Sequence, residues 1–264
     1  MITQLKNRAL LKLSGPDAQS FLHNQLSNDV NALKAGEVQL NAYCQHQGKI
    51  IALFWLIQQG SDYYLSFPED LKSLVVQRFT MFKLMSVVEI EDLSDQVIQL
   101  GVIDEVFEGS YRFNNQQSVA LVEDAGGLEL VDDTFWNKAC IDNQVPEVSL
   151  ATSEKFVPQM LNLDIDEMGV SFTKGCYPGQ EVVARLHYLG EAKRRLYRFE
   201  STHELQVGDE LLASDSISAK ASGMVVSCVA SESRYLCLAT MEVAHKDGQI
   251  SLKSVEGSRL TRID

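Results

Sequence analysis

The C-terminal stretch from Lys193 onward restricts the possible folds most, because it contains only short strand patterns interrupted by glycine and aspartate. The strand patterns lie at 196–199, 210–213, 224–229, 235–241 and 249–255. Short strands at such spacing are typical of a small antiparallel barrel or sandwich. We therefore predict a β-barrel domain over residues 193–264.

Residues 1–92 combine helix and strand patterns and predict an α+β unit. Apolar residues recur every three or four positions over 18–33 and over 69–82, as on the buried face of a helix. A serine followed three residues later by an acidic residue favours a helix start, and this spacing occurs at Ser14–Asp17 and at Ser66–Glu69. Strand patterns lie at 8–13, 37–44, 49–58, 62–67 and 87–90.

Residues 93–192 predict a second, shortened α+β unit. Strand patterns lie at 97–102, 118–122 and 128–131, with no convincing long helix between them. Such a thin unit needs the first unit to bury its core.

Charge and cysteine content restrict the class of partner. The 264 residues include 23 basic and 36 acidic side chains, a formal net charge of −13. This balance repels a phosphate backbone, so we expect no direct nucleic-acid binding.

Five irregularly spaced cysteines without a C-x-x-C pair indicate reduced thiols and no metal site. The longest apolar run, 50–57, is too short to span a membrane, and we expect a cytoplasmic protein.

Residues 171–185, SFTKGCYPGQEVVAR, contain the side chains best suited to chemistry. Pro178 and Gly179 favour a type II turn. Lys174 and Cys176 share a parity, so on an extended backbone the ammonium would lie near the thiol and favour the nucleophilic thiolate. The alternative is a proline–glycine loop with a buried cysteine that acts as a small hydrophobic residue.

Lys174 to Glu181 resembles the K-G-C-[YF]-x-G-Q-E signature of the YgfZ family. These are folate-binding proteins related to the T-protein (aminomethyltransferase) of the glycine cleavage system. Further similarity at 15–30, 47–49 and 156–163 extends the resemblance over most of the chain. It implies an α+β fold of three subdomains, ferredoxin-like α+β units and a C-terminal antiparallel β-barrel, in a ring around a central hole. It also implies tetrahydrofolate as cofactor and Cys176 as the reactive residue, assisted by Lys174.

The resemblance further implies a role in maintaining iron–sulfur enzymes, including the one that methylthiolates tRNA. On this reading we expect an N-terminal folate-binding unit at 1–92, a second unit at 93–192 that ends in the signature loop, and the barrel at 193–264. Contact with tRNA would be indirect.

A folate site needs a carboxylate for the pterin edge, an aromatic face, and cations for the glutamate tail. The resemblance assigns Trp136 to folate binding, and the alternative for Trp136 is a core anchor. Asp142 stands where relatives carry the glutamate that holds the pterin. Arg8 stands where some relatives have a second folate-contacting tryptophan, and an arginine can also stack on a ring.

Further candidate cofactor contacts lie in and after the signature. They are Gln180, Glu181, Arg185 and Arg194. Glu181 and Arg185 would pair on a helix. Basic residues gather over 185–198, which favours an anion site or an acidic partner, the alternative being a solvated barrel edge.

Two classes of function remain. One is an accessory protein that binds folate and uses Cys176 to support iron–sulfur enzymes. The other is a folate-dependent aminomethyl or one-carbon transferase like the T-protein. T-proteins lack the signature cysteine and have an acidic residue just after the turn that matches Gln47-Gly48. Because residues 47–61 contain no Asp or Glu, no general acid or base is evident there, which favours the accessory protein. A third possibility is that the folate pocket is retained only as part of the structure and that the protein acts as a docking partner.

Overall fold

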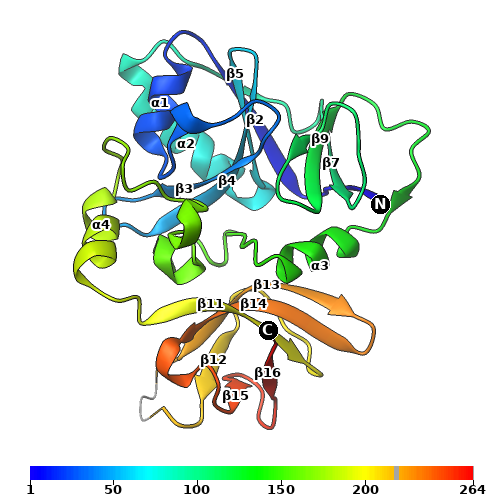
Figure 1. Ribbon diagram of the computed structural model, residues 1–264, viewed down its shortest axis with the longest axis vertical. Coiled ribbons are helices and arrows are strands. Elements are labelled where there is room, and N and C mark those ends of the chain that lie inside the picture. Colours follow the sequence, from blue (N-terminus) through cyan, green and yellow to red (C-terminus); the bar gives the residue numbers. More distant parts are fainter. Residues whose placement is uncertain (217–219, 264) are drawn as a thin grey trace.

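The computed structural model describes residues 1–216 and 220–263, and its chain forms two β-sheets and a closed barrel (Figure 1). Helices α3 (Thr134–Asp142) and α4 (Gln180–Leu189) lie between the sheets and the barrel. The mixed α+β fold with a C-terminal barrel confirms the predicted fold class. None of the described helices is long and apolar enough to cross a membrane.

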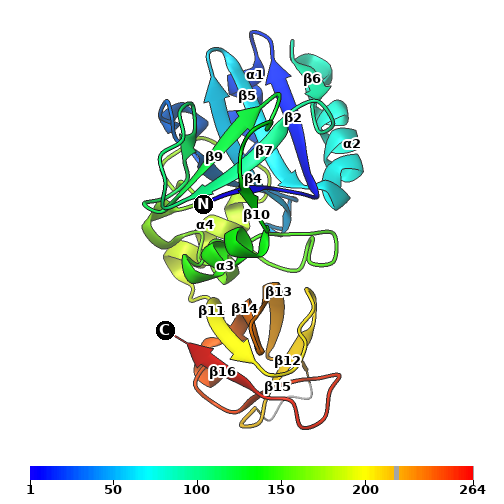
Figure 2. The ribbon, with the colours of Figure 1, turned by 90° about the vertical axis from the view of Figure 1, so that its right-hand side faces the viewer.

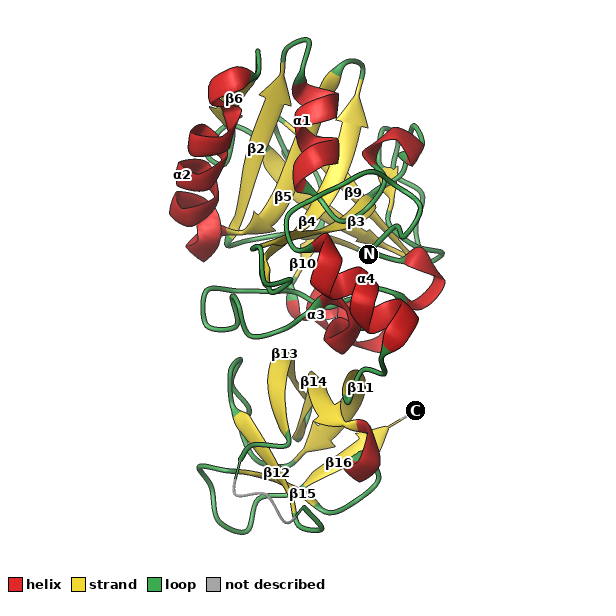
Figure 3. Cartoon of the chain, turned by 90° about the vertical axis from the view of Figure 1, so that its left-hand side faces the viewer, coloured by secondary structure: helices red, strands yellow, loops and turns green. Residues whose placement is uncertain are grey.

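The first sheet is antiparallel and has the strand order β3-β4-β5-β2-β6. Helices α1 (Ala18–Gln25) and α2 (Lys72–Phe82) cover one face (Figure 3). The aromatic rings of Phe21 and Phe79 meet edge to face there, 5.5 Å apart. The strands are β2 (Arg8–Ser14), β3 (Gln39–Cys44), β4 (Ile50–Gln59), β5 (Asp62–Pro68) and β6 (Glu89–Asp92).

The helix predicted over 18–33 ends early, at Gln25. Leu26 has an extended backbone and bridges Tyr43, and the amide of Ser27 donates to the carbonyl of Ala42. Pairing with β3 therefore replaces the last helical turns, although the apolar spacing continues. Short 3-10 helices follow α1 at Val30–Ala32 and flank α2 at Glu69–Leu71 and Lys83–Met85.

The second sheet has the order β10-β1-β7-β9-β8 and lies on the other face of the first sheet (Figure 2). Its strand β1 (Ile2–Gln4) comes from the start of the chain, parallel to β10 and antiparallel to β7. Neither β1 nor α3 has a counterpart among the sequence predictions. The other strands are β7 (Ile98–Ile103), β8 (Tyr111–Arg112), β9 (Gln117–Val122) and β10 (Leu130–Val131).

The barrel closes with six strands in the order β11-β14-β13-β12-β15-β16. The predicted strands all occur, and β16 closes the barrel by pairing with β11 and β15. The strands are β11 (Arg194–Ser201), β12 (Glu210–Ala213), β13 (Gly223–Ser231), β14 (Arg234–Glu242), β15 (Ile250–Leu252) and β16 (Leu260–Ile263). Further 3-10 helices are Pro158–Leu161, Ile165–Glu167 and Val243–His245.

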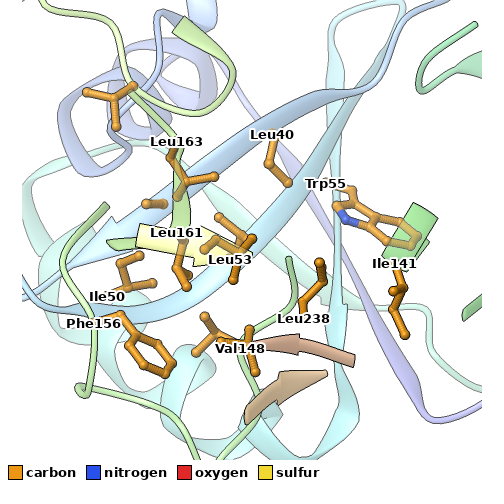
Figure 4. Close-up of a cluster of buried hydrophobic side chains, with 14 of the residues drawn as sticks. Leu40, Ile50, Leu53, Trp55, Ile141, Val148, Phe156, Leu161, Leu163 and Leu238 are labelled. Atoms are coloured by element: carbon orange, nitrogen blue, oxygen red, sulfur yellow. The ribbon is translucent and has the colours of Figure 1, made fainter. Parts of the chain in front are cut away.

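One hydrophobic core joins the three parts (Figure 4). Leu53 and Trp55 of the first sheet pack with Ile141 of α3, Phe156 of the connecting segment and Leu238 of the barrel. Because all these side chains are buried, the barrel and the first sheet hold each other in position, and the cavity between them has a defined shape.

Candidate functional site

A cavity of about 590 Å³ lies where the first sheet, α3 and the barrel meet. Its wall comes from the turn between β1 and β2, from α3, from the loop 145–149 and from β13. Its lining includes two tryptophans, an arginine, a glutamate and two thiols: Trp55, Trp136, Arg8, Glu147, Cys140 and Cys228. Four more charged side chains line it as well: Lys6, Glu69, Asp70 and Asp133.

The tryptophans form the aromatic wall of the cavity. The ring centroids of Trp55 and Trp136 are 5.7 Å apart, with an interplanar angle of 58°. Both side chains are also part of the shared core, so Trp136 is a core anchor and a cavity residue at once. Gly101 of β7 makes room for it, because a Cβ there would lie 2.4 Å from the indole of Trp136. The sequence contains only these two tryptophans.

Arg8 is one of two cations in the cavity wall, Lys6 being the other. Its guanidinium carbon lies 3.5 Å from the Trp55 ring centroid, a cation–π contact. Nε donates to the hydroxyl of Ser66 at 2.8 Å, and Nη1 donates to the carboxylate of Glu147. The buried Nη2 has no hydrogen-bond partner among the described residues. One donor of this guanidinium is therefore left for a further acceptor.

Four carboxylates line the cavity, those of Glu69, Asp70, Asp133 and Glu147, and none of them was predicted as a site residue. Glu147 is the one that pairs with Arg8. Asp142 lies elsewhere: it pairs with Lys138 on α3 and with Arg198 at 3.3 Å, and it lines a separate depression of about 290 Å³. Asp142 lies two positions after Cys140, about 200° further around the helix, and therefore on its opposite side. In the sequence, Glu147 is the one acidic residue between the apolar Val145 and Val148, and this pattern is the signal that could have identified it.

The signature loop packs on α1 and on the β3–β4 hairpin. Gly179 has the positive φ of 83° that the predicted turn requires, and α4 begins directly after it. A Cβ on Gly179 would lie 2.5 Å from the carbonyl oxygen of Gln45 and 2.7 Å from Cα of Gly48. Only glycine therefore allows this approach. Cys176 is exposed to solvent.

Cys176 and the central cavity are separate sites. None of the signature residues 174–181 lines the cavity, all of them being described. The thiol of Cys176 is thus exposed, but its loop lies apart from the cavity.

Lys174 points into the protein, whereas Cys176 points to solvent. The ammonium of Lys174 donates to two carbonyl oxygens at the end of α1, that of His23 and, at 2.6 Å, that of Leu26. Burial lowers the pKa of Lys174 to about 8. The ammonium also lies 5.2 Å from the Tyr177 ring, and burial raises the pKa of that phenol. Lys174 thus fastens the loop to α1.

The other candidate contacts also lie away from the cavity. Gln180 donates to the carbonyl of Gly175 at 3.5 Å, within the loop. Glu181 and Arg185 are exposed on α4, and the ion pairs of the described residues do not join them. Arg194 donates to the carbonyl of Ala221 and pairs with Glu242 at 3.1 Å.

The basic segment does not form one anion site. Arg195 pairs with Asp164 and Arg198 with Asp142, so the arginines of β11 go to different carboxylates. The cation beside the cavity, apart from Arg8, is Lys6.

The cavity thiols are protonated at neutral pH. Burial raises the pKa of Cys140 to about 12 and that of Cys228 to about 11. The described residues contain no group of three His, Cys, Asp or Glu side chains that could hold a metal ion.

The fold is that of an aminomethyltransferase of the glycine cleavage system. The crystal structure of aminomethyltransferase T from Bartonella henselae matches it with a TM-score of 0.71 over 99% of this chain and 84% of that one, at 11% sequence identity. At that identity the likeness shows the fold alone.

Sequence comparison places the chain in the YgfZ family. An uncharacterized protein of Haemophilus influenzae is 32% identical over 229 residues, covering 83% of this chain and 81% of the relative. The tRNA-modifying protein YgfZ of Colwellia psychrerythraea is 28% identical, covering 77% and 72%. That of Aliivibrio fischeri is 27% identical, covering 89% and 82%. No family model matches the sequence. The chain belongs to the YgfZ family.

Proposed function

We propose that this protein binds tetrahydrofolate in the central cavity and supports iron–sulfur enzymes in the cytoplasm, and through them tRNA modification. The observation that carries the proposal is the cavity, whose wall combines two indoles, a stacked guanidinium and a carboxylate. The YgfZ relatives from Colwellia and Aliivibrio are named tRNA-modifying proteins, which supports the cellular part.

The residues present fit a pteridine. The pterin edge carries adjacent N–H donors, and Glu147 supplies an acceptor whose side chain is 41% exposed. The Nη2 of Arg8 is a donor without a partner among the described residues, suited to a ring oxygen or nitrogen. Trp55 and Trp136 supply the apolar wall. The volume of about 590 Å³ lies within the roughly 300–1,000 Å³ of typical ligand sites.

Each of these residues would hold or orient the ligand. Glu147 and Arg8 would fix the polar edge of the pterin, and Lys6 would face the negative charge of the glutamate tail. Tetrahydrofolate, when bound, supplies a carrier for one-carbon units. Because Arg8 already neutralises Glu147, the pair is better suited to binding than to the proton transfers of an aminomethyltransferase, which is the less favoured alternative.

The thiol of Cys176 would serve a partner protein. It is exposed on a loop that does not line the cavity, so a macromolecule can reach it without entering the folate site. In this proposal folate binding and the thiol are two parts of one accessory protein.

Tryptophan fluorescence tests the folate site, because both tryptophans line the cavity. We expect tetrahydrofolate to quench the emission saturably, with calorimetry on the same samples giving the Kd. Glu147→Gln should weaken binding by about tenfold, as expected for a lost charged hydrogen bond. Glu200→Gln, which removes a carboxylate from the barrel surface, should leave the Kd unchanged.

Asp142→Asn distinguishes the two carboxylates. If that variant loses affinity and Glu147→Gln does not, the pterin is held elsewhere than we propose. Absence of any saturable signal from the unmodified protein refutes folate binding altogether.

A further inference from the structure

Two cysteines of the barrel are direct neighbours across a pair of strands. In the hairpin of β13 and β14, Cys228 lies opposite Cys237 in the antiparallel register (Figure 1). All five cysteines lie in described parts of the chain, and no other two of them are strand partners. Residues opposite each other in such a ladder place their side chains on the same face of the sheet. Both side chains accordingly pack in one hydrophobic cluster of the barrel.

The hairpin turn determines how closely the two backbones approach at the cysteines. Ser231 and Arg234 close a two-residue loop, in which Glu232 has a positive φ of 53°. Such a loop is closed by a hydrogen-bonded pair, and hydrogen-bonded and non-hydrogen-bonded pairs alternate along the ladder. The register is regular over this stretch, so Cys228 and Cys237, three pairs further along, form a non-hydrogen-bonded pair. The Cα atoms of such a pair are about 4.5 Å apart, within the roughly 4.4–6.8 Å that a disulfide spans.

The two thiols differ in their access to solvent. Cys237 is fully buried, whereas Cys228 is partly exposed and lines the central cavity. The Sγ of Cys228 donates to the carbonyl oxygen of Leu205 at 3.1 Å, which gives this thiol a defined orientation. A small solute that enters the cavity therefore meets Cys228 first, and Cys237 lies next to it in the barrel core.

Both thiols are protonated at neutral pH. Burial, and then the carboxylates of Asp209 and Glu204, raise the pKa of Cys228 to about 11. Burial also raises the pKa of Cys237, and the nearby Cys228 is the second cause of that shift, in agreement with the strand register. Because the thiolate is the reactive form, the pair is slow to react at neutral pH and stays reduced until an oxidant is present in excess.

We propose that Cys228 and Cys237 are a redox-active pair, which a hydroperoxide that enters the cavity converts to a cross-strand disulfide. The sulfur of Cys228 attacks one oxygen of hydrogen peroxide and the O–O bond breaks, which leaves a sulfenic acid. The departing hydroxide takes the proton of the Cys228 thiol and becomes water. The sulfur of Cys237 then attacks the sulfenic sulfur, the S–S bond forms, and the hydroxyl leaves with the Cys237 proton as a second water. Two thiols are thus oxidised and one peroxide is reduced to two waters.

Closure of the disulfide changes the wall of the central cavity. The Sγ of Cys228 gives up its proton and with it the hydrogen bond to Leu205, whose loop also supplies Val207 to the cavity lining. The oxidation state of the barrel thereby alters a surface that a ligand in the cavity would contact. This site is distinct from the exposed thiol of Cys176 and does not depend on the proposed binding of folate.

Peptide mapping of the full-length chain tests the pair. Cys176→Ala serves as the starting protein, because the exposed thiol of Cys176 can join two molecules. The reduced protein is treated with hydrogen peroxide in mildly alkaline solution, free thiols are blocked with N-ethylmaleimide, and the chain is cut with trypsin. Cleavage after Arg234 places Cys228 and Cys237 on separate peptides, 221–234 and 235–246. We expect these peptides to be joined, with the mass of two hydrogen atoms lost, and dithiothreitol should separate them.

Two further variants identify the partners. Cys237→Ala should abolish the link and leave Cys228 as a sulfenic acid, which dimedone traps. Cys140→Ala is the matched control, because Cys140 lines the same cavity with a pKa raised to about 12, and its sulfur contacts the amide of Gln117. Its removal should leave the link between the two barrel peptides unchanged. Circular dichroism of each variant excludes unfolding as the cause.

Three outcomes would overturn the proposal. The two barrel peptides could stay separate while Cys228 is oxidised to a sulfinic acid, which would place the sulfurs too far apart. Cys228 could instead be joined to Cys140, which would make the second cavity thiol its partner. Both barrel thiols could also stay free in peroxide that oxidises Cys176 of the unmodified protein, which would show that the oxidant does not reach them. No folate is present in this experiment, so its result is independent of the fluorescence titration.

Discussion

The guanidinium carbon of Arg8 lies 3.5 Å from the ring centroid of Trp55, while Nη1 of the same side chain is paired with Glu147. This one residue connects β2 and β4 of the first sheet to the loop 145–149, which follows α3. The carboxylate that would contact a pterin is thus held by a cation that is itself held by an indole, which is a preorganised arrangement for binding.

Replacing Arg8 should weaken the structure as well as the site. We expect Arg8→Ala to lower the free energy of unfolding by about 2 kcal/mol, since a buried cation–π contact and two hydrogen bonds are lost. Urea unfolding measures the change. Arg112→Ala is the control, because its ion pair with Glu37 is exposed and should account for less than about 1 kcal/mol. Equal losses in the two variants would contradict the contact.

The approach of Trp136 to Gly101 predicts a steric effect. In Gly101→Ala the new methyl group would meet the indole at 2.4 Å, so Trp136 must move. We expect a loss of about 1–3 kcal/mol in unfolding free energy and a shifted tryptophan emission. In the control Gly126→Ala the nearest atoms are the side-chain oxygens of Asp124, which can rotate away. An unchanged emission in Gly101→Ala would show that the packing is looser than described.

Lys174 should give the stability a pH dependence. Its folded-state pKa of about 8 lies below the ordinary lysine pKa of 10.5, so between these values the unfolded chain binds more protons. The free energy of unfolding therefore gains a contribution as the pH rises from 8 towards 10.5, at most about 1.4 kcal/mol per pH unit. Urea unfolding across this range should show the gain in the unmodified protein relative to Lys174→Met. Parallel curves would mean that the ammonium is better solvated than its burial indicates.

Cys176 should be the first cysteine to react with iodoacetamide at neutral pH. It is exposed, whereas burial raises the pKa of Cys44 and Cys140 to about 12 and that of Cys228 to about 11. We expect at least about tenfold faster alkylation at Cys176, because only the thiolate reacts. Mass spectrometry of the modified peptides measures all five sites in one sample. A rate for Cys176 among the slowest would exclude it as a nucleophile.

The proposed cellular role predicts that the thiol is required. In a bacterial strain without its own YgfZ, the unmodified chain should restore the activity of a dependent iron–sulfur enzyme, and Cys176→Ala should not. Because Cys176 is exposed, its removal should change stability by no more than about 0.5 kcal/mol, which urea unfolding checks. Full rescue by Cys176→Ala would limit the cysteine to a structural role.

The fold could be predicted from sequence to a large extent because its signals are local. Strand alternation and helical spacing depend on neighbouring residues, and they located the strands of the first sheet, α2 and the main strands of the barrel. Strand β1 is too short to give such a signal and is stabilised by pairing with distant strands. The early end of α1 likewise reflects a tertiary contact, between Leu26 and Tyr43.

The site was harder to predict, because a cavity is made by residues that meet only in the folded chain. Trp136 and Arg8 were selected through the family resemblance, and both line the cavity. Asp142 was selected by its position in a motif, yet the rotation of α3 turns it away and Glu147 lies at the cavity instead. Nothing in the sequence spacing connects His23 with Gly175, which are neighbours only because the loop folds back on α1.

The placement of β1 between β7 and β10 has a consequence for biosynthesis. Ile2 pairs with Val102 and with Leu130, so during synthesis it waits for partners that are made a hundred or more residues later. Closing so long a segment is entropically costly, so this sheet should assemble late. Residues Ile2 to Gln4 therefore join their sheet only after the strand at Leu130–Val131 has been made.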